Sequence, residues 1–227
     1  MFLDCHCHTI YSKHWLWGFD SLNTPEEMVK AAIKKGLNGL AVTDHNNVKG
    51  SLVAQKIAKK YKNFKIITGT EIITTSGEIT GLGIKKNVPM LLSLDETIEK
   101  IHDLGGIAVA PHPFGIHFLR RCVRNGASKA DAIEVFNSTL AKPANQKALI
   151  LAKKFNKSIT AGSDAHSINE VGNAGIICGS DPLEDIIKNK VKIFGKKTPL
   201  IDTAYLLSRK FIRSVEWRIS RTRKNYI

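Results

Sequence analysis

The sequence lacks any apolar stretch long enough to cross a membrane. None of its apolar runs reaches the roughly 18 uninterrupted positions of a membrane-spanning helix, and the N-terminus MFLDCHCHT has no basic segment followed by an apolar one. Four cysteines in 227 residues do not resemble the disulfide framework of a small secreted domain. These absences predict a protein of the reducing cytoplasm without a membrane partner.

Acidic residues are few relative to basic ones. Asp and Glu total 20 against 34 Lys and Arg, which gives a formal net charge of +14. Residues 207–227 hold seven of these basic side chains and one acidic residue, Glu216, a local excess of +6. The charge is consistent with an anionic phosphorylated substrate or a nucleic acid, and also with a lysine-rich solvated surface. It does not specify an oligomeric state.

Linkers rich in Gly, Pro or Ser, internal repeats and low-complexity tracts are absent as well, which predicts a single domain. A composition of 43% hydrophobic and 24% charged residues is typical of a globular protein. Short apolar runs rich in β-branched residues alternate with amphipathic stretches of helical period. This alternation predicts an α/β fold with a parallel sheet, either closed as a barrel or open and doubly wound.

The predicted elements cover most of the chain. The apolar runs predict strands at Phe2–Cys5, Gly39–Thr43, Lys65–Gly69, Ile107–Ala110, Ala132–Val135, Ser158–Ala161, Gly175–Cys178 and Lys192–Phe194. Helices are predicted at Pro25–Lys35, Val48–Tyr61, Leu94–Leu104, Phe118–Asn125, Ala144–Phe155 and Leu183–Lys188.

Two further segments interrupt this alternation. The segment Ile73–Ile84, with Ser76 and Gly77 at its centre, predicts a β-hairpin after the third strand. Residues Leu200–Ile219 predict a long terminal helix, whose apolar positions recur every three to four residues at Leu206, Leu207, Phe211, Val215 and Ile219. We expect this apolar face to dock onto the rest of the protein.

Histidines gather where the predicted strands end. Five of the eight lie just after a strand: His6, His8, His45, His112 and His166. His14 falls in the loop after the first strand, whereas His102 and His117 are expected to be ordinary surface or half-buried residues. Carboxylates follow the same rule, at Asp4, Asp44, Glu71, Glu78 and Asp164. Side chains at the carboxyl ends of strands converge on one rim of a β/α barrel, so a site is predicted there.

The alternation of the first strand separates two kinds of side chain. Period two sends Asp4, His6 and His8 to one face and Cys5 and Cys7 to the other, where we expect small buried residues. Imidazole and carboxylate ligands together suit Zn, Mn or Fe, whereas Ca and Mg prefer oxygen ligands. A zinc finger built on CHCH is less favoured, because it needs ligands from both faces of one strand and a second Cys pair downstream.

Five motifs follow one another at the predicted strand ends: DCHCHT at Asp4–Thr9, TDHN at Thr43–Asn46, GTE at Gly69–Glu71, APHPF at Ala110–Phe114 and GSDAHS at Gly162–Ser167. Taken together, they resemble the PHP (polymerase and histidinol phosphatase) family. The resemblance implies a distorted (β/α)7 barrel over residues 1–200 and two or three divalent transition-metal ions at the barrel rim. The charge and apolar spacing of the remaining residues predict a basic amphipathic C-terminal helix at 201–227 packed on the domain.

The resemblance assigns the ligands residue by residue. His6, His8 and Asp164 would bind a first metal, Glu71 would bridge it to a second, and His112 would bind the second. A third metal would be bound by His14, His45 and His166. The family often supplies another His to the second metal from the hairpin, where this chain has Glu78 in the matching position. A carboxylate can serve as a ligand there, although it adds negative charge.

The chemistry implied is hydrolysis of a phosphate ester by metal-activated water, with no Ser or Cys nucleophile. The catalytic candidates are Asp44, Glu71, His112 and Asp164, with Asp4 and Asp44 considered for orienting a ligand or handling protons and Glu134 expected behind the ligands. The candidate substrate contacts are Arg120, Arg121, Asn137 and Lys142. The substrate could be a nucleotide, a nucleic-acid end or a small phosphomonoester such as histidinol phosphate. An amidohydrolase or deaminase, and a non-catalytic nucleic-acid-binding module with structural metals, are the competing hypotheses.

Overall fold

The computed structural model describes residues 1–13, 20–115 and 122–224, with side chains up to residue 215. Within them the chain forms nine strands: β1 (Phe2–Cys7), β2 (Gly39–Val42), β3 (Lys65–Thr74), β4 (Gly77–Leu82), β5 (Ile107–Ala110), β6 (Ala132–Asn137), β7 (Ser158–Gly162), β8 (Ala174–Ile177) and β9 (Lys192–Gly195). Helical segments are α1 (Pro25–Lys34), α2 (Lys49–Ala58), α3 (Leu94–Asp103), the 3₁₀ helix η1 (Arg124–Lys129), α4 (Lys142–Lys154), α5 (Pro182–Ile187) and α6 (Leu200–Lys224).

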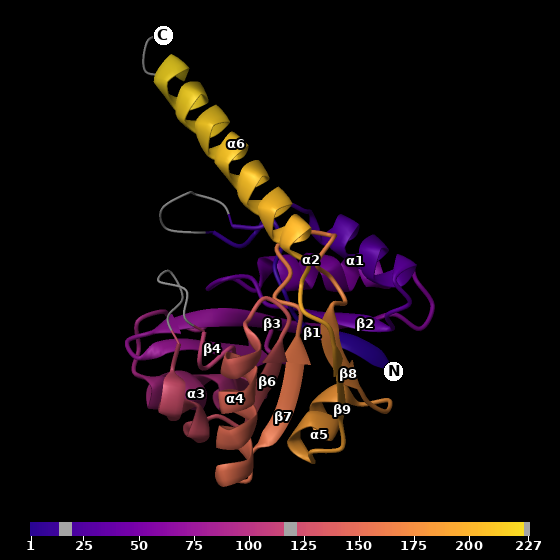
Figure 1. The fold of residues 1–227 in the computed structure, drawn as a ribbon, viewed down its shortest axis with the longest axis vertical. Helices are drawn as coiled ribbons and strands as arrows, with labels where there is room; N and C mark the ends of the chain where they lie inside the picture. Colours follow the sequence, from indigo (N-terminus) through magenta and orange to yellow (C-terminus); the bar gives the residue numbers. More distant parts are fainter. Residues whose placement is uncertain (14–19, 116–121, 225–227) are drawn as a thin grey trace.

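All nine strands belong to one sheet, in the order β7-β6-β5-β4-β3-β2-β1-β8-β9. Strands β1, β2 and β3 run parallel, as do β5, β6 and β7. The β3–β4 hairpin and the pair β8–β9 supply the antiparallel strands. Helix α2 packs on β3, α3 on β4 and α4 on β6 (Figure 1).

The sheet nearly closes into a barrel at the carboxyl ends of its parallel strands. There β1 meets the residues that follow β7, through a parallel bridge between Cys7 and Ala165. His8 N donates to Ala165 O at 2.8 Å, and Asp164 N donates to His6 O at 2.8 Å. The distorted barrel and single domain predicted from the sequence are therefore confirmed, with the rim closed where the histidine motifs lie.

The sequence predicted most of the elements correctly. The eight strands and the hairpin are present, and Thr24 and Ser93 cap α1 and α3 through reciprocal bonds with Glu27 and Glu96. The helix predicted at Phe118–Asn125 differs, since residues 116–121 lie outside the described part of the chain and η1 begins only at Arg124. A φ of +49° at Arg124 prevents an α-helix from running through this position.

The predicted alternation along β1 is wrong, because a register irregularity lies between Asp4 and Cys7. Cys5 packs with strand residues such as Leu3, whereas Cys7 packs beneath helix α1. Both cysteines are buried as predicted, but in different clusters. Such a bulge inserts one residue into the strand and reverses the side to which the following side chains point.

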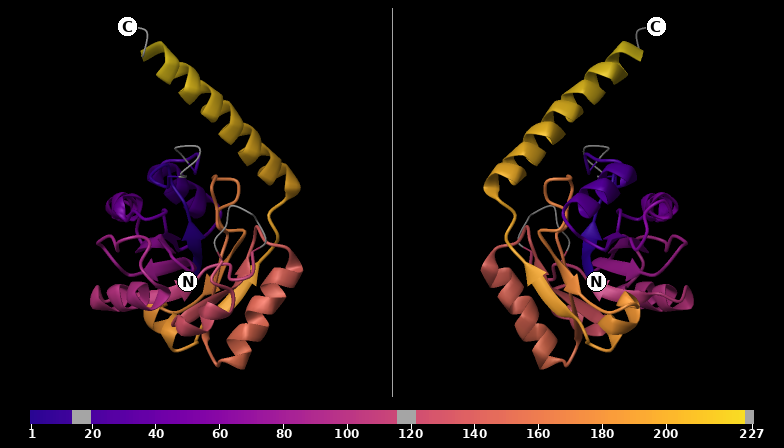
Figure 2. Two further views of the ribbon diagram at one scale, coloured as in Figure 1. Left: turned by 90° about the vertical axis from the view of Figure 1, so that its left-hand side faces the viewer. Right: turned by 90° about the vertical axis from the view of Figure 1, so that its right-hand side faces the viewer.

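Helix α6 leaves the body at the end of the barrel toward which β7 points, and projects away from it (Figures 1 and 2). The prediction that its apolar face docks onto the domain is wrong for most of that face: Leu207 is 60% exposed, Phe211 is 71% exposed and Val215 is 39% exposed. The side turned to the body carries the buried Leu206 and Ser214. The helix is long enough to extend past the barrel, so its outer face meets no other described element.

No helix within the described ranges is both long and apolar enough to cross a lipid bilayer. The hydrophobic core instead lies in three clusters around the sheet. One of them gathers side chains from seven of the strands, among them Leu3, Ala41, Ile67, Leu82, Val109, Ala132 and Ile176. This packing holds the strand ends, and with them the polar rim, in fixed relative positions.

Asp4 supplies a test of the closure. Its carboxylate is fully buried and accepts hydrogen bonds from His6 N (3.2 Å), Ser163 N (2.9 Å), Ser163 Oγ (2.5 Å) and Gly172 N (2.8 Å). It therefore joins β1 to the chain after β7. We expect Asp4→Ala to lower the free energy of unfolding by about 3 kcal/mol, because buried donors lose a charged acceptor.

The measurement is urea unfolding in excess chelator, so that metal binding does not contribute. Asp103→Ala is the matched control, since Asp103 is exposed and pairs only with Lys100 at 3.1 Å among the described ion pairs. Equal unfolding midpoints for the two variants would show that the Asp4 bonds do not hold the barrel closed.

Candidate metal centre

The polar rim brings its side chains together in three overlapping groups. Each residue offers one ligand atom, and within a group these atoms lie within 4.8 Å of one another. The groups are His6, Glu71 and His112; His6, His8 and Asp164; and His8, Asp20, His45 and His166. Seven of these eight residues are at most 9% exposed. The convergence predicted from the strand ends is therefore present, with one residue, Asp20, that the sequence analysis missed.

Glu71 on β3 lies between the groups. Its Oε2 is 3.4 Å from His6 Nε2, 3.4 Å from His8 Nε2 and 3.3 Å from His45 Nδ1, and its Oε1 is 3.0 Å from His112 Nε2. One carboxylate thus faces four imidazoles. This is the arrangement expected of a carboxylate that bridges two cations, the role that the family resemblance implied for Glu71.

The second ring nitrogens of the histidines are held by the protein. His6 Nδ1 is 3.0 Å from Glu134 Oε1, His166 Nδ1 is 2.8 Å from the carbonyl oxygen of Asp164, and His8 Nδ1 is 3.2 Å from Ser12 Oγ. A hydrogen bond at Nδ1 fixes the ring and its tautomer and leaves Nε2 as the ligand atom. In all three residues Nε2 faces the shared space between the groups.

A buried network behind the ligands orients the carboxylates. Glu134 Oε2 accepts from His112 N at 2.7 Å and from Asn137 Nδ2 at 3.0 Å. Asn137 Nδ2 also donates to Asp164 Oδ2 at 3.2 Å, and its Oδ1 accepts from the Thr139 hydroxyl at 2.6 Å. Glu134 therefore has the supporting position expected from the sequence. Asn137, predicted to contact substrate, is fully buried and uses its amide group on protein atoms.

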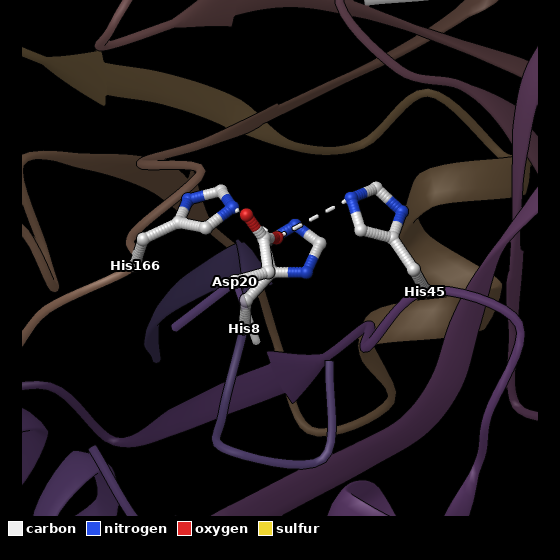
Figure 3. A group of neighbouring side chains, drawn as sticks. All are labelled: His8, Asp20, His45 and His166. Carbon is white, nitrogen blue, oxygen red and sulfur yellow. Dashed lines mark hydrogen bonds and ion pairs between the residues drawn. The ribbon is translucent and has the colours of Figure 1, made fainter. Parts of the chain in front are cut away.

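Asp20 completes the third group from the loop before α1 (Figure 3). Its Oδ2 is 2.7 Å from His166 Nε2 and 3.4 Å from His45 Nε2, and accepts from Ser12 Oγ at 3.2 Å. The sequence analysis missed it because Asp20 follows no strand. The clue available in the sequence was the position of Asp20 four residues before Thr24, the N-cap of α1, in the connection between β1 and that helix. His14, assigned to this metal by resemblance, lies outside the described residues.

Electrostatics keep two carboxylates of the centre, Glu71 and Asp20, ionised. Burial would raise the pKa of Glu71, but His6 and His45 outweigh it and hold that pKa well below its usual range. Burial would also raise the pKa of Asp20, but His166 and Lys210 outweigh it and hold that pKa well below its usual range. Burial and the neighbouring His166 lower the pKa of His8 to about 3, so this imidazole is neutral at physiological pH. Ionised carboxylates and a neutral imidazole are the forms that bind a cation.

Two buried polar atoms that face other ligand groups but make no hydrogen bond are consistent with bound metal ions. His45 Nδ1 and Glu71 Oε1 are buried and make no hydrogen bond, although the latter lies close to His112. Orphaned polar atoms of this kind are costly in a protein interior unless another group satisfies them. Two other residues of the centre, His112 and Asp164, have left-handed φ values of +27° and +54°. Backbone strain of this kind clusters at functional sites.

Glu78 and Asp44 lie outside the three groups. Glu78 on β4 is buried, and its Oε2 is 3.9 Å from His112 Nε2, next to the group in which it was predicted to take part. Asp44 accepts from Thr9 N at 2.5 Å and from Thr9 Oγ1 at 2.7 Å, and burial raises its pKa to about 6. Its role in proton handling stays a prediction.

The remaining predicted residues are placed as follows. Lys142 is exposed at the start of α4. His102 pairs with Asp131 at 2.7 Å on the surface, as expected for a residue outside the site. Arg120, Arg121 and His117 fall outside the described residues. Asp4, considered for orienting a ligand histidine, bonds to backbone N–H groups and the Ser163 hydroxyl instead, and Glu134 takes that role for His6.

Comparison with known proteins agrees with this geometry. The family model for the PHP domain matches residues 4–202. The chain belongs to the PHP domain family. All eight residues of the three groups lie inside this PHP domain, whereas most of α6 follows it.

Several known proteins are similar to most of the chain. A protein of Methanocaldococcus jannaschii, named as uncharacterized, is 41% identical over 139 residues, which are 60% of this chain and 81% of that protein. A probable phosphatase of Caldicellulosiruptor bescii is 28% identical in an alignment of 236 positions that covers 84% of this chain and 92% of that one. A crystal structure from Bifidobacterium adolescentis, classed as a metal-dependent phosphoesterase, has a TM-score of 0.59 at 18% identity, covering 72% of this chain and 87% of its own.

The geometry of this PHP domain predicts that Asp20 contributes to metal binding. We expect Asp20→Ala, dialysed and measured by elemental analysis, to hold one equivalent of metal less per chain than the unchanged protein, because the third group loses its only carboxylate. His102→Ala, on the surface and outside the three groups, should keep the full content. Full metal content in Asp20→Ala as well would contradict a ligand role for Asp20, whereas the assignment of His14 stays a prediction.

Proposed function

We propose that this PHP domain protein hydrolyses phosphate esters with water, using two or three divalent transition-metal ions. The observation that carries the proposal is the position of Glu71, whose two oxygens face ring nitrogens from all sides of the centre. The names of two similar proteins, a probable phosphatase and a metal-dependent phosphoesterase, support the same reaction class.

The three overlapping groups would hold the ions, with each imidazole nitrogen binding a single ion and the carboxylate of Glu71 lying between the groups. Imidazole and carboxylate donors favour Zn, Mn or Fe over Ca and Mg. When bound, such ions supply Lewis-acid catalysis, lower the pKa of water and stabilise charge on the attacking and leaving oxygens. The protein keeps the ligands in place through Glu134 and Asn137 and excludes bulk water by burying nearly all of them.

For the substrate we propose a nucleotide or the phosphorylated end of a nucleic acid. The net charge of +14 favours a polyanion over a zwitterion such as histidinol phosphate, which is the second candidate. An amidohydrolase that uses a carboxylated lysine is less favoured, because no lysine directly follows the described strands β1, β2, β3, β5 or β7, which lead to the ligands. We also propose a cytoplasmic location, which the four free cysteines support.

Removal of the charge on Glu71 tests the proposal. Glu71→Gln keeps the side-chain volume but loses the carboxylate between the groups, so we expect the rate of phosphate release to fall by about 10³-fold, roughly 4 kcal/mol of barrier. His102→Ala, on the surface, should stay within about twofold of the unchanged protein. Initial rates with added Zn, Mn or Fe are measured on mononucleotides, 5′-phosphorylated oligonucleotides and histidinol phosphate. Comparable losses in the two variants would contradict the assignment.

The basic end of α6 tests the nucleic-acid alternative. If it follows a phosphate backbone, affinity for single strands should fall with log salt by about 0.7 per contact. We expect the combined variant Arg218→Gln, Arg221→Gln, Arg223→Gln and Lys224→Gln to bind oligonucleotides more weakly and with a shallower salt slope. Its hydrolysis of a small phosphomonoester should not change. An unchanged slope would make this segment a solvated surface and favour a small substrate.

A further inference from the structure

Helix α6 reaches the metal centre from beyond the segment that matches the family. The match ends at residue 202, and Lys210 lies two turns further along the helix. Its Nζ is 2.9 Å from Asp20 Oδ1, and its side chain is only 20% exposed. A lysine that the PHP domain itself does not contain thus contacts a member of the third group.

Asp20 divides its two oxygens between different partners. Oδ2 faces His45 and His166, in the space where an ion would bind, while Oδ1 accepts from Lys210. The ammonium group is therefore at the edge of the centre, one carboxylate away from the ligand atoms. From there, the ammonium group is placed to contact any part of a metal-bound ligand that extends toward α6.

A second cation of α6 holds the helix in this position. Arg213 Nη1 donates to Leu22 O at 3.2 Å, and Leu22 N donates to His166 O at 2.9 Å. The loop that carries Asp20 is therefore fixed on one side by α6 and on the other by the chain after β7. Attachment of the helix does not depend on Lys210 alone.

Lys210 differs from the other described cations in its partner. Within residues 1–13, 20–115 and 122–215, the Lys–carboxylate pairs other than Lys210–Asp20 join side chains that are at least half exposed, such as Lys100 with Asp103 and Lys129 with Asp95. Exposed pairs of that kind contribute little to stability. The partner of Lys210 is instead a buried carboxylate of the metal centre.

We propose that Lys210 is a substrate-binding residue, whose ammonium group binds a non-bridging phosphate oxygen at the Asp20 side of the centre. An ammonium group has three N–H donors, and Asp20 accepts one of them. A phosphoryl group held by the ions would present oxygens to the other two, in a charge-assisted hydrogen bond. The inference rests on the proposed phosphoesterase function and adds a substrate-binding residue from outside the domain.

The experiment uses the metal-loaded full chain and inorganic phosphate as the probe. Calorimetric titration should give a phosphate affinity about tenfold weaker for Lys210→Gln than for the unchanged protein, with the same metal content by elemental analysis. On whichever phosphomonoester is hydrolysed, KM should rise by a similar factor while kcat changes less than about threefold. Lys210→Arg, which keeps the charge, should restore most of the affinity.

Two matched variants separate binding from attachment of the helix. Arg209→Gln removes the same charge from the adjacent, exposed position and should bind phosphate as the unchanged protein does. Arg213→Gln removes the other anchor of α6 and should leave phosphate affinity within about twofold. Equal phosphate affinity for Lys210→Gln and the unchanged protein would overturn the inference, as would an equal loss in Arg213→Gln.

The result also distinguishes this inference from the proposed function. Phosphate binding that depends on Lys210 without turnover of any ester supports the binding role and contradicts the hydrolase. Turnover that is indifferent to Lys210→Gln supports the hydrolase and contradicts the binding role. A metal-loaded protein that binds no phosphate contradicts the inference directly.

Discussion

The centre depends on the backbone hydrogen bonds that close the barrel between β1 and the residues after β7. His6 O accepts from Asp164 N, and His8 N donates to Ala165 O. These two bonds bring together two segments that are more than 150 residues apart in sequence, and they set His6 and His8 beside Asp164 and His166. No choice of side chains could assemble the three groups if this edge of the sheet were open. Asp4 strengthens the same edge from the side facing away from the ligands.

Burial of carboxylates and imidazoles in a protein interior has a desolvation cost, which the interactions among these groups offset only in part. Glu71 and Asp20 stay ionised because imidazoles and Lys210 surround them, and Glu134 and Asn137 satisfy the atoms that face away from the centre. His45 Nδ1 and Glu71 Oε1 are left without hydrogen bonds. The fold thus tolerates a buried polar cluster that is able to bind metal ions, which is a common feature of sites kept for chemistry rather than for stability.

The strand ends and most of the ligands could be predicted from the sequence, because β/α alternation places successive carboxyl ends on one rim whatever the loops do. Asp20 and Lys210 could not be predicted in this way. One lies in a loop whose path depends on tertiary contacts, and the other on a helix beyond the barrel. The face of α6 was predicted wrongly for a related reason. Hydrophobic spacing identifies the apolar side of a helix, yet the contacts of Lys210 and Arg213 decide which side meets the domain.

The irregularity in β1 decides which side of the sheet its histidines face. Below it, Leu3 and Cys5 pack on the side of the sheet away from α1, and above it His6 and His8 face that same side because one extra residue resets the alternation. A regular strand of the same composition would turn both histidines under the helices, where Cys7 now lies. Straightening this irregularity while keeping every residue would therefore remove the centre without changing a single ligand. The local geometry of β1 is as much a requirement of the site as the identity of its residues.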